Sequence, residues 1–154
     1  MPVFKLDPNR VPDFWDLIKP GLLMGRNISG IEGDWDFANS VLEHAISDHC
    51  QIWLGFEEGE PTGDSYVGFV ITHLNVDWFS KSKDLVLYFA YLYKTASDRL
   101  RADAVMAFSK YARGLGCTRI VAYTDNAAME KLINSFFGSH IKKRQLYYVN
   151  MEDF

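Results

Sequence analysis

LVLYFAYLYKTASDRLRADAVMAFSKYARGLG, residues 85–116, is the stretch that decides the fold. It opens with an uninterrupted apolar run from Leu85 to Tyr93, which is too short for a globular helix and rich in aromatic residues. Such a run predicts a strand that is buried on both faces. A polar stretch follows from Lys94 to Asp98, and Gly116 stands where a helix C-cap glycine belongs. Between them, apolar residues recur at helical spacing, at Leu100, Ala104, Ala107, Phe108, Tyr111 and Leu115. We therefore predict a strand, a short loop and a helix.

This order of elements favours a phosphate site at the start of the helix. The first backbone N–H groups of a helix have no partner within it, and the helix dipole favours an anion at the same end. A buried strand that runs through a short loop into a helix N-terminus is a common way for α/β proteins to hold phosphates.

The composition predicts a single domain, residues 1–154. A chain of 154 residues that is 48% hydrophobic can bury a core of its own. No apolar run approaches the ~20 residues that span a bilayer, so no membrane association is expected. The first residues, Met1 to Phe4, lack a signal peptide's apolar region, which predicts a cytoplasmic protein. Cys50 and Cys117 stand in apolar settings, where we expect buried free thiols and no metal.

Charge is distributed unevenly along the chain. Residues 1–84 hold 6 Lys or Arg and 14 Asp or Glu, whereas residues 85–154 hold 10 and 6, so the two parts carry −8 and +4. This distribution is either a chance feature of a solvated surface or an acidic part facing a cationic substrate and a basic part facing an anionic one. A pI near 5.5 without a dense basic stripe argues against nucleic-acid binding.

The first third of the chain predicts one edge strand and two helices. Residues 3–6 alternate weakly, as in an edge strand, and a helix follows from Val11 until Pro20-Gly21 stops it. The glycine-rich stretch 21–33 predicts a loop, either a substrate lid or a plain connector. Asp34 is the expected N-cap of the second helix.

The remaining elements predict a mixed sheet covered by helices. Residues 50–56 and 65–74 form an antiparallel hairpin, and another strand is expected over 118–124. Asp125 or Asn126 caps a further helix, and a final strand is expected over about 141–151. The fold class is therefore α/β (α+β), with a mostly antiparallel central sheet and about four helices.

The element order and residues 85–138 resemble the GCN5-related N-acetyltransferase (GNAT) superfamily. In that family the strand before the long helix leads into Arg/Gln-x-x-Gly-x-Gly/Ala, which wraps the pyrophosphate of acetyl-CoA. The matching residues here are Arg99, Leu100, Arg101, Ala102, Asp103 and Ala104. The resemblance also implies that the backbone of Tyr91 to Lys94, including Leu92 and Tyr93, pairs with the pantetheine arm, and that Asn126 lies along this arm. Small proteins of this kind are common in tailed-bacteriophage genomes, so a phage origin is part of the expectation.

Two departures from the family pattern bear on cofactor binding. Ala102 replaces the usual glycine, which is unfavourable at a position with positive φ but harmless if the position is helical. Asp103 adds a negative charge beside the expected anion site, although Lys94, Arg99 and Arg101 keep the segment slightly cationic.

The catalytic residues are less well defined. The family often uses a central-strand Glu as base and a tyrosine after the Asn as acid; this strand has no acidic residue, and Ile133 stands at the tyrosine position. Tyr88, Tyr91 or Tyr123 could donate a proton instead, and His73 could act as a base near neutral pH. For each of these side chains, packing or a satisfied polar group is the commoner role.

We therefore favour an acetyl-CoA-dependent N-acetyltransferase, with acetyl-CoA as co-substrate and an amine of a small molecule or protein as acceptor. The alternative is a catalytically inactive GNAT-fold protein that acts as a binding, regulatory or virion-associated module. A homodimer stays open. The aromatic pair Trp78-Phe79 in the loop before the central strand indicates either a contact surface or packing in the core or loop.

Overall fold

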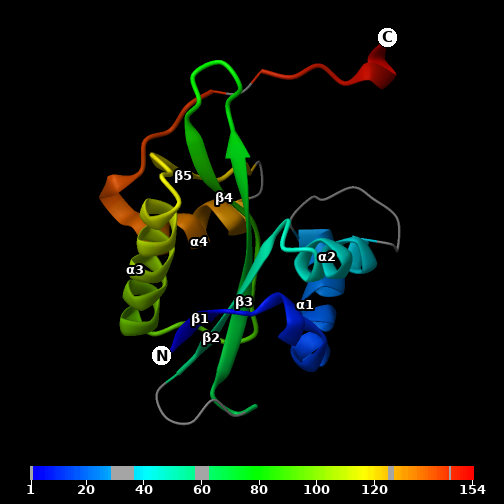
Figure 1. Ribbon diagram of the computed structural model, residues 1–154, viewed down its shortest axis with the longest axis vertical. Helices are drawn as coiled ribbons and strands as arrows, with labels where there is room; N and C mark the ends of the chain where they lie inside the picture. The colour runs from blue at the N-terminus through cyan, green and yellow to red at the C-terminus, as the bar shows by residue number, and fades with distance from the viewer. Residues whose placement is uncertain (1, 29–36, 58–62, 125–126, 146) are drawn as a thin grey trace.

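The computed structural model describes residues 2–28, 37–57, 63–124, 127–145 and 147–154. Five strands and four α-helices are found in these residues (Figure 1). In chain order they are β1 (Val3–Lys5), α1 (Trp15–Ile28), α2 (Phe37–Ile46), β2 (Gln51–Phe56), β3 (Tyr66–Val76), β4 (Lys83–Leu92), α3 (Asp98–Gly114), β5 (Arg119–Val121) and α4 (Ala127–Phe137). Short 3₁₀ helices cover Pro8–Phe14, Gly138–His140 and Met151–Asp153.

The sheet has the strand order β1-β2-β3-β4-β5. All neighbours pair antiparallel except β4 and β5, which are parallel. Helices α1 and α2 lie on one face of the sheet, and α3 and α4 lie on the other (Figure 1). The predicted fold class is confirmed: a mixed, mostly antiparallel sheet is flanked by four helices.

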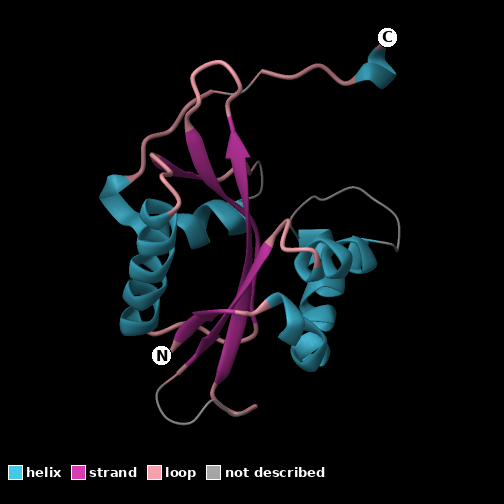
Figure 2. Ribbon diagram, viewed as in Figure 1, coloured by secondary structure: helices cyan, strands magenta, loops and turns pink. Residues whose placement is uncertain are grey.

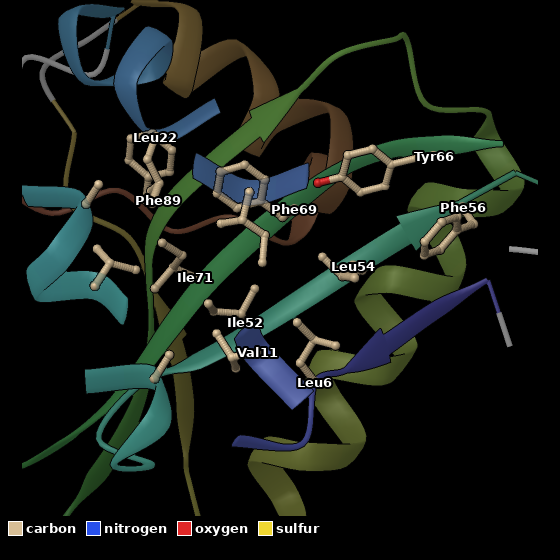
Figure 3. Packing of buried hydrophobic residues seen from close by; sticks show 14 residues of the cluster. Leu6, Val11, Leu22, Ile52, Leu54, Phe56, Tyr66, Phe69, Ile71 and Phe89 are labelled. Carbon is tan, nitrogen blue, oxygen red and sulfur yellow. The ribbon is translucent and has the colours of Figure 1, made fainter. Parts of the chain in front are cut away.

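Each face of the sheet has its own apolar core. Figure 3 shows the core under α1 and α2, where Leu22 packs with strand residues such as Ile52, Leu54, Phe69 and Phe89. The second core lies under α3, whose inward side carries Leu100, Ala104, Phe108 and Ala112. Successive side chains of one strand point to opposite faces of the sheet, so the same strands contribute residues to both cores. The sheet therefore fixes the positions of the two helical layers relative to each other.

The helix predicted after the central strand is confirmed, and Gly116 follows its C-terminal end as expected. Ser97 is the N-cap of α3, and its hydroxyl oxygen accepts a hydrogen bond from the Leu100 N–H at 3.1 Å. Gly116 has φ of +77°, the left-handed conformation in which glycine avoids the strain of a Cβ.

The expectation that Pro20-Gly21 ends the first helix is wrong, because α1 continues through both residues to Ile28. The glycines serve close packing. An ideal Cβ on Gly21 would lie 2.5 Å from Phe69 Cε1, and one on Gly25 would lie 2.6 Å from Phe89 Cζ. Tertiary packing of α1 against the sheet thus overrides the local helix-breaking signal. The rest of the expected glycine loop and Asp34 lie outside the described residues.

The expectation that the central strand is buried on both faces holds only for its first part. Asp84, Leu85 and Val86 are buried, but Tyr88 is 42% exposed. The reason is that β5 is short and covers only the start of β4. The run of apolar residues in the sequence therefore includes side chains that face an open region.

The expected final strand is also wrong. In the described part of residues 141–151 the chain has no strand, and it leaves the body as an extended segment that ends far from the sheet (Figure 2). The sheet therefore ends at β5. Cys50 and Cys117 are free, as expected, although each is only partly buried. None of the helices described is long and apolar enough to cross a membrane.

Candidate active site

The candidate active site begins where β4 and β5 part. Pairing between them covers only Asp84 to Val86, opposite Arg119 to Val121. From Leu87 to Leu92, β4 keeps β3 as its single strand neighbour among the described residues. The other edge of this segment carries backbone N–H and C=O groups that can pair with an added extended chain.

An ion pair joins the first paired residues of β4 and β5, two residues before the strands part. The Arg119 guanidinium donates to both carboxylate oxygens of Asp84, from Nε to Oδ1 at 2.9 Å and from Nη2 to Oδ2 at 2.8 Å. Asp84 is buried, and the bidentate geometry is the stronger form of this contact. The hydrogen bonds raise the pKa of Arg119, followed in effect by the charge of Asp84. The β4–β5 junction is thus held together by charge as well as by backbone pairing.

A β-bulge on β4 places Tyr88 in the open region. Ile71 pairs with Phe89 and Thr72 pairs with Leu87, so Tyr88 is an extra residue between the two pairs. A bulge re-aims side chains and is common beside active sites. Burial raises the pKa of Tyr88, so its hydroxyl keeps its proton at neutral pH and can act as a donor.

Two of the four predicted catalytic residues, His73 and Tyr88, lie together here. The His73 and Tyr88 rings are 5.9 Å apart between centroids, in an edge-on arrangement. Tyr91 lies three residues further along β4 and is engaged with other groups: its hydroxyl donates to Met24 Sδ at 3.8 Å, and its ring packs edge-on against Tyr93 at 4.9 Å. The geometry therefore pairs His73 with Tyr88 and places Tyr91 on the α1 side.

The predicted pyrophosphate segment, Arg99 to Ala104, lies entirely within α3. Ala102 is consequently in a helical position, where alanine is the most favourable residue and no positive φ is required. The N–H groups of Ala102, Asp103 and Ala104 point along the helix and bond within it. An anion would therefore meet the first turn of α3 and the loop before it.

A carboxylate that the sequence did not reveal already lies at this helix end. Glu57, the residue after β2, accepts hydrogen bonds from the Ser97 N–H at 3.0 Å and from the Ser97 hydroxyl at 2.9 Å. A negative side chain is favourable at a helix N-terminus for the same reason that a phosphate is. Glu57 lies between the two strands of the predicted hairpin, forty residues before Ser97, and no local pattern predicts this contact.

The other cationic and backbone groups near the helix start are also engaged. Arg101 donates from Nη1 to the Ala96 carbonyl at 2.8 Å and pairs with Asp98. Lys94 donates to the Asp64 carbonyl. Tyr93 donates its N–H to Val67 at 2.7 Å and its hydroxyl to the Leu17 carbonyl at 2.9 Å.

The remaining predicted residues divide between the core and the strand end. Leu100 is buried in the second core, and Leu92, at the end of β4, packs beside it. Asn126 lies outside the described residues. The described residues hold no group of three or more His, Cys, Asp or Glu side chains able to bind a metal ion.

Comparison with known proteins supports the fold. No protein-family model matches the sequence, and no curated protein matches it either. Among solved structures, a probable acetyltransferase has a TM-score of 0.66 at 18% identity, covering 97% of this chain and 99% of its own. An aminoglycoside acetyltransferase from an uncultured soil metagenomic sample, in complex with sisomicin, has a TM-score of 0.64 at 10% identity, with coverages of 97% and 94%. A predicted acetyltransferase of Clostridium acetobutylicum, with acetyl-CoA, has a TM-score of 0.57 at 12% identity, with coverages of 99% and 97%.

These similarities extend over nearly the whole chain and show that it shares the fold of these acetyltransferase structures. At such identities the fold is what is shared, so the chemistry must be argued from this chain's own residues.

Proposed function

We propose that the protein is an N-acetyltransferase that transfers the acetyl group of acetyl-CoA to an amine. The observation that carries this proposal is the open edge of β4 from Leu87 to Leu92, with Tyr88 bulged into it. The amide groups of a pantetheine arm can pair with such an edge as an added strand. One of the structures similar in fold contains acetyl-CoA.

The fit of the residues to acetyl-CoA differs between its two ends. The β4 edge suits the pantetheine arm. At the diphosphate end, the first turn of α3 suits an anion. The Glu57 carboxylate, however, already accepts the Ser97 N–H there, and its negative charge repels a diphosphate. We infer that Glu57 moves aside when a diphosphate binds, with Arg99 adding positive charge at the same end of the helix.

Acetyl-CoA would supply the activated acetyl group, and the chain would supply position and proton transfer. In the reaction an amine forms a bond to the acetyl carbon, the carbon–sulfur bond breaks, and the amine loses a proton. We assign Tyr88 as the donor that protonates the leaving thiolate, because its hydroxyl stays protonated in this environment. His73 would accept the proton of the amine, directly or through water.

The acceptor would be a cationic amine of a small molecule or protein. The excess of acidic residues in residues 1–84 favours such a substrate, and a structure of similar fold was determined with the aminoglycoside sisomicin. Polyamines, protein lysines and aminoglycosides all carry the required charge.

Calorimetric titration with acetyl-CoA tests the cofactor site, with desulfo-CoA and ATP as comparison ligands. We expect micromolar binding that weakens as salt concentration rises, because a diphosphate is held partly by charge. Arg99→Glu should abolish binding while leaving the fold intact.

Arg113→Glu is the matched control, since Arg113 lies in the last turn of the same helix and changes the net charge equally. It should bind like the wild type. A folded Arg99→Glu protein with unchanged affinity would remove the proposed diphosphate position, and no binding by the wild type would favour a non-catalytic role for the fold.

A further inference from the structure

Two exposed apolar segments lie at the same end of the molecule, along its longest axis (Figure 1). The first is the tip of the β3–β4 hairpin, which we define as residues 77–82. It presents Trp78 and Phe79 with exposed fractions of 84% and 99%. Single exposed apolar residues are ordinary, but two adjacent aromatic side chains almost wholly in water need an explanation.

The hairpin tip is held in a fixed shape. The Asp77 carboxylate accepts hydrogen bonds from the N–H groups of Phe79 and Ser80 at 2.8 and 2.9 Å. Asp77 also bonds through its backbone to Lys81 and Ser82, at 2.9 Å in each case. The hydrogen bonds from Ser80 and Phe79 lower the pKa of Asp77. The aromatic pair is therefore presented without a large ordering cost on binding.

The second segment is the outgoing chain, residues 147–154, which extends away from the body at this same end (Figure 2). Its apolar side chains are strongly exposed. They are Tyr147, Tyr148, Val149, Met151 and Phe154, with exposed fractions between 60% and 92%. An extended apolar segment of this kind gains from burial against another surface.

We propose that these two segments cover one another between two copies of the chain, so that residues 147–154 of each copy pack on the hairpin tip of the other. A twofold axis at this end of the molecule would form both contacts at once, because a hairpin tip and an outgoing segment are present on each copy. The proposal goes beyond acetyl transfer and does not depend on it.

The available area is sufficient for a stable dimer. Each copy brings five exposed aromatic residues to the contact, Trp78, Phe79, Tyr147, Tyr148 and Phe154. At about 150 Å² or more for each aromatic residue, the ten in a dimer bury roughly 1,500 Å². A standard specific interface buries about 1,600 Å².

Charge also favours contact between a hairpin tip and an outgoing segment over contact between two hairpin tips or between two outgoing segments. Lys81 stands beside the aromatic pair on the hairpin tip, whereas Glu152 and Asp153 stand among the apolar residues of the outgoing segment. All three side chains are exposed, so they would form a polar rim around the apolar contact. The Asp77 carboxylate is turned inward to the backbone of the hairpin tip.

Sedimentation analysis of the full chain over a wide concentration range tests the proposal. We expect a species of twice the 17.7 kDa chain mass. Phe79→Ser and deletion of residues 146–154 should each raise the dimer dissociation constant at least about tenfold. Met106→Ser, which removes an apolar side chain that is 69% exposed on α3, should leave it unchanged.

A charge reversal identifies which segments meet. Lys81→Glu and Glu152→Lys should each weaken the dimer, and the double variant should recover part of the loss. Circular dichroism checks that every variant is folded. A wild-type protein that stays monomeric, or a folded deletion variant that dimerises as well as the wild type, would overturn the proposal. Binding of the monomer to lipid vesicles through Trp78 and Phe79 would overturn it too.

Discussion

The Glu57 carboxylate accepts two hydrogen bonds from Ser97, the N-cap of α3. The Ser97 hydroxyl also accepts a hydrogen bond from the Leu100 N–H. Glu57, which follows β2, thus binds the N-cap of a helix that begins only after two further strands, β3 and β4. This contact stabilises α3 and opposes the diphosphate that we place at the same end.

Replacing Glu57 separates these two effects. Glu57→Gln keeps the shape of the side chain and removes its charge. We expect acetyl-CoA to bind about two- to fivefold more tightly, and the free energy of unfolding to fall by about 0.3–1 kcal/mol, the usual worth of a charge at a helix end. Calorimetry and urea denaturation measure the two quantities.

Glu43→Gln makes the same change of charge on an exposed part of α2 and should alter neither quantity appreciably. Weaker acetyl-CoA binding in Glu57→Gln would show that Glu57 supports the cofactor instead of competing with it.

The glycines of α1 are predicted to be required by space and not by backbone conformation. A Cβ at position 25 would lie 2.6 Å from Phe89 Cζ and 2.8 Å from Tyr91 Cδ2. Gly25→Ala should therefore lower the free energy of unfolding by about 1–3 kcal/mol, despite the better helix propensity of alanine. Gly114→Ala in α3 meets no atom within 4 Å and should raise it by up to about 1 kcal/mol. Thermal or urea unfolding compares the two; equal effects would show that α1 has room for a methyl group.

The same glycines show where sequence reasoning about the fold succeeds and fails. The five strands of the sheet, α3 and its Gly116 end follow from local patterns, because apolar spacing and capping act over a few residues. Pro20-Gly21 is a strong local stop signal, yet α1 continues, since the aromatic rings of β3 and β4 that it packs against are far away in the sequence. The segment after Ile141 has the composition of a strand. Among the residues that the structure describes, no other strand lies beside it to supply hydrogen bonds, so it forms no strand.

Burial of Cys50 predicts a loss of stability at alkaline pH. Its pKa is raised from 9.0 to about 11, mainly by burial and then by the charge of Asp48. The folded thiol therefore holds a proton that the unfolded chain releases, so its contribution is fully present below about pH 9 and is lost as the pH rises towards 11. Burial also raises the pKa of Tyr66, which acts in the same direction.

Urea denaturation at several pH values between 8 and 11 measures this dependence. The slope of the free energy of unfolding against pH reports how many more protons the folded chain holds than the unfolded chain. In Cys50→Ala this number should be smaller by up to about one, so the free energy of unfolding should fall less steeply with pH. An identical slope in both proteins would mean that the thiol titrates alike in the folded and unfolded chains.

Tyr88→Phe tests the assigned proton donor once an amine substrate supports turnover. Loss of a general acid should lower kcat about 10²-fold or more while leaving KM for acetyl-CoA nearly unchanged. Thiol release from acetyl-CoA measures the rate. Tyr111→Phe removes a hydroxyl from α3, beside Trp53 on the opposite face of the sheet, and should not change kcat. A fully active Tyr88→Phe enzyme would exclude the assignment.

The site itself was only partly predictable. Tyr88 and His73 were candidates because of residue type and strand position, and their proximity depends on the register between β3 and β4, including the bulge. Neither the bulge nor the short reach of β5 is marked by a local pattern. The contact between Glu57 and Ser97 is likewise a product of tertiary structure, so the competition at the start of α3 could not be foreseen.

Hydrogen exchange of the full chain with and without acetyl-CoA tests the central claim most directly. If the pantetheine arm pairs with the open edge of β4, amides between Leu87 and Leu92 and at the start of α3 become protected, while those of β2 stay unchanged. Acetyl-CoA at saturating concentration with no change in β4 would contradict the proposed site and, with it, the acetyltransferase assignment.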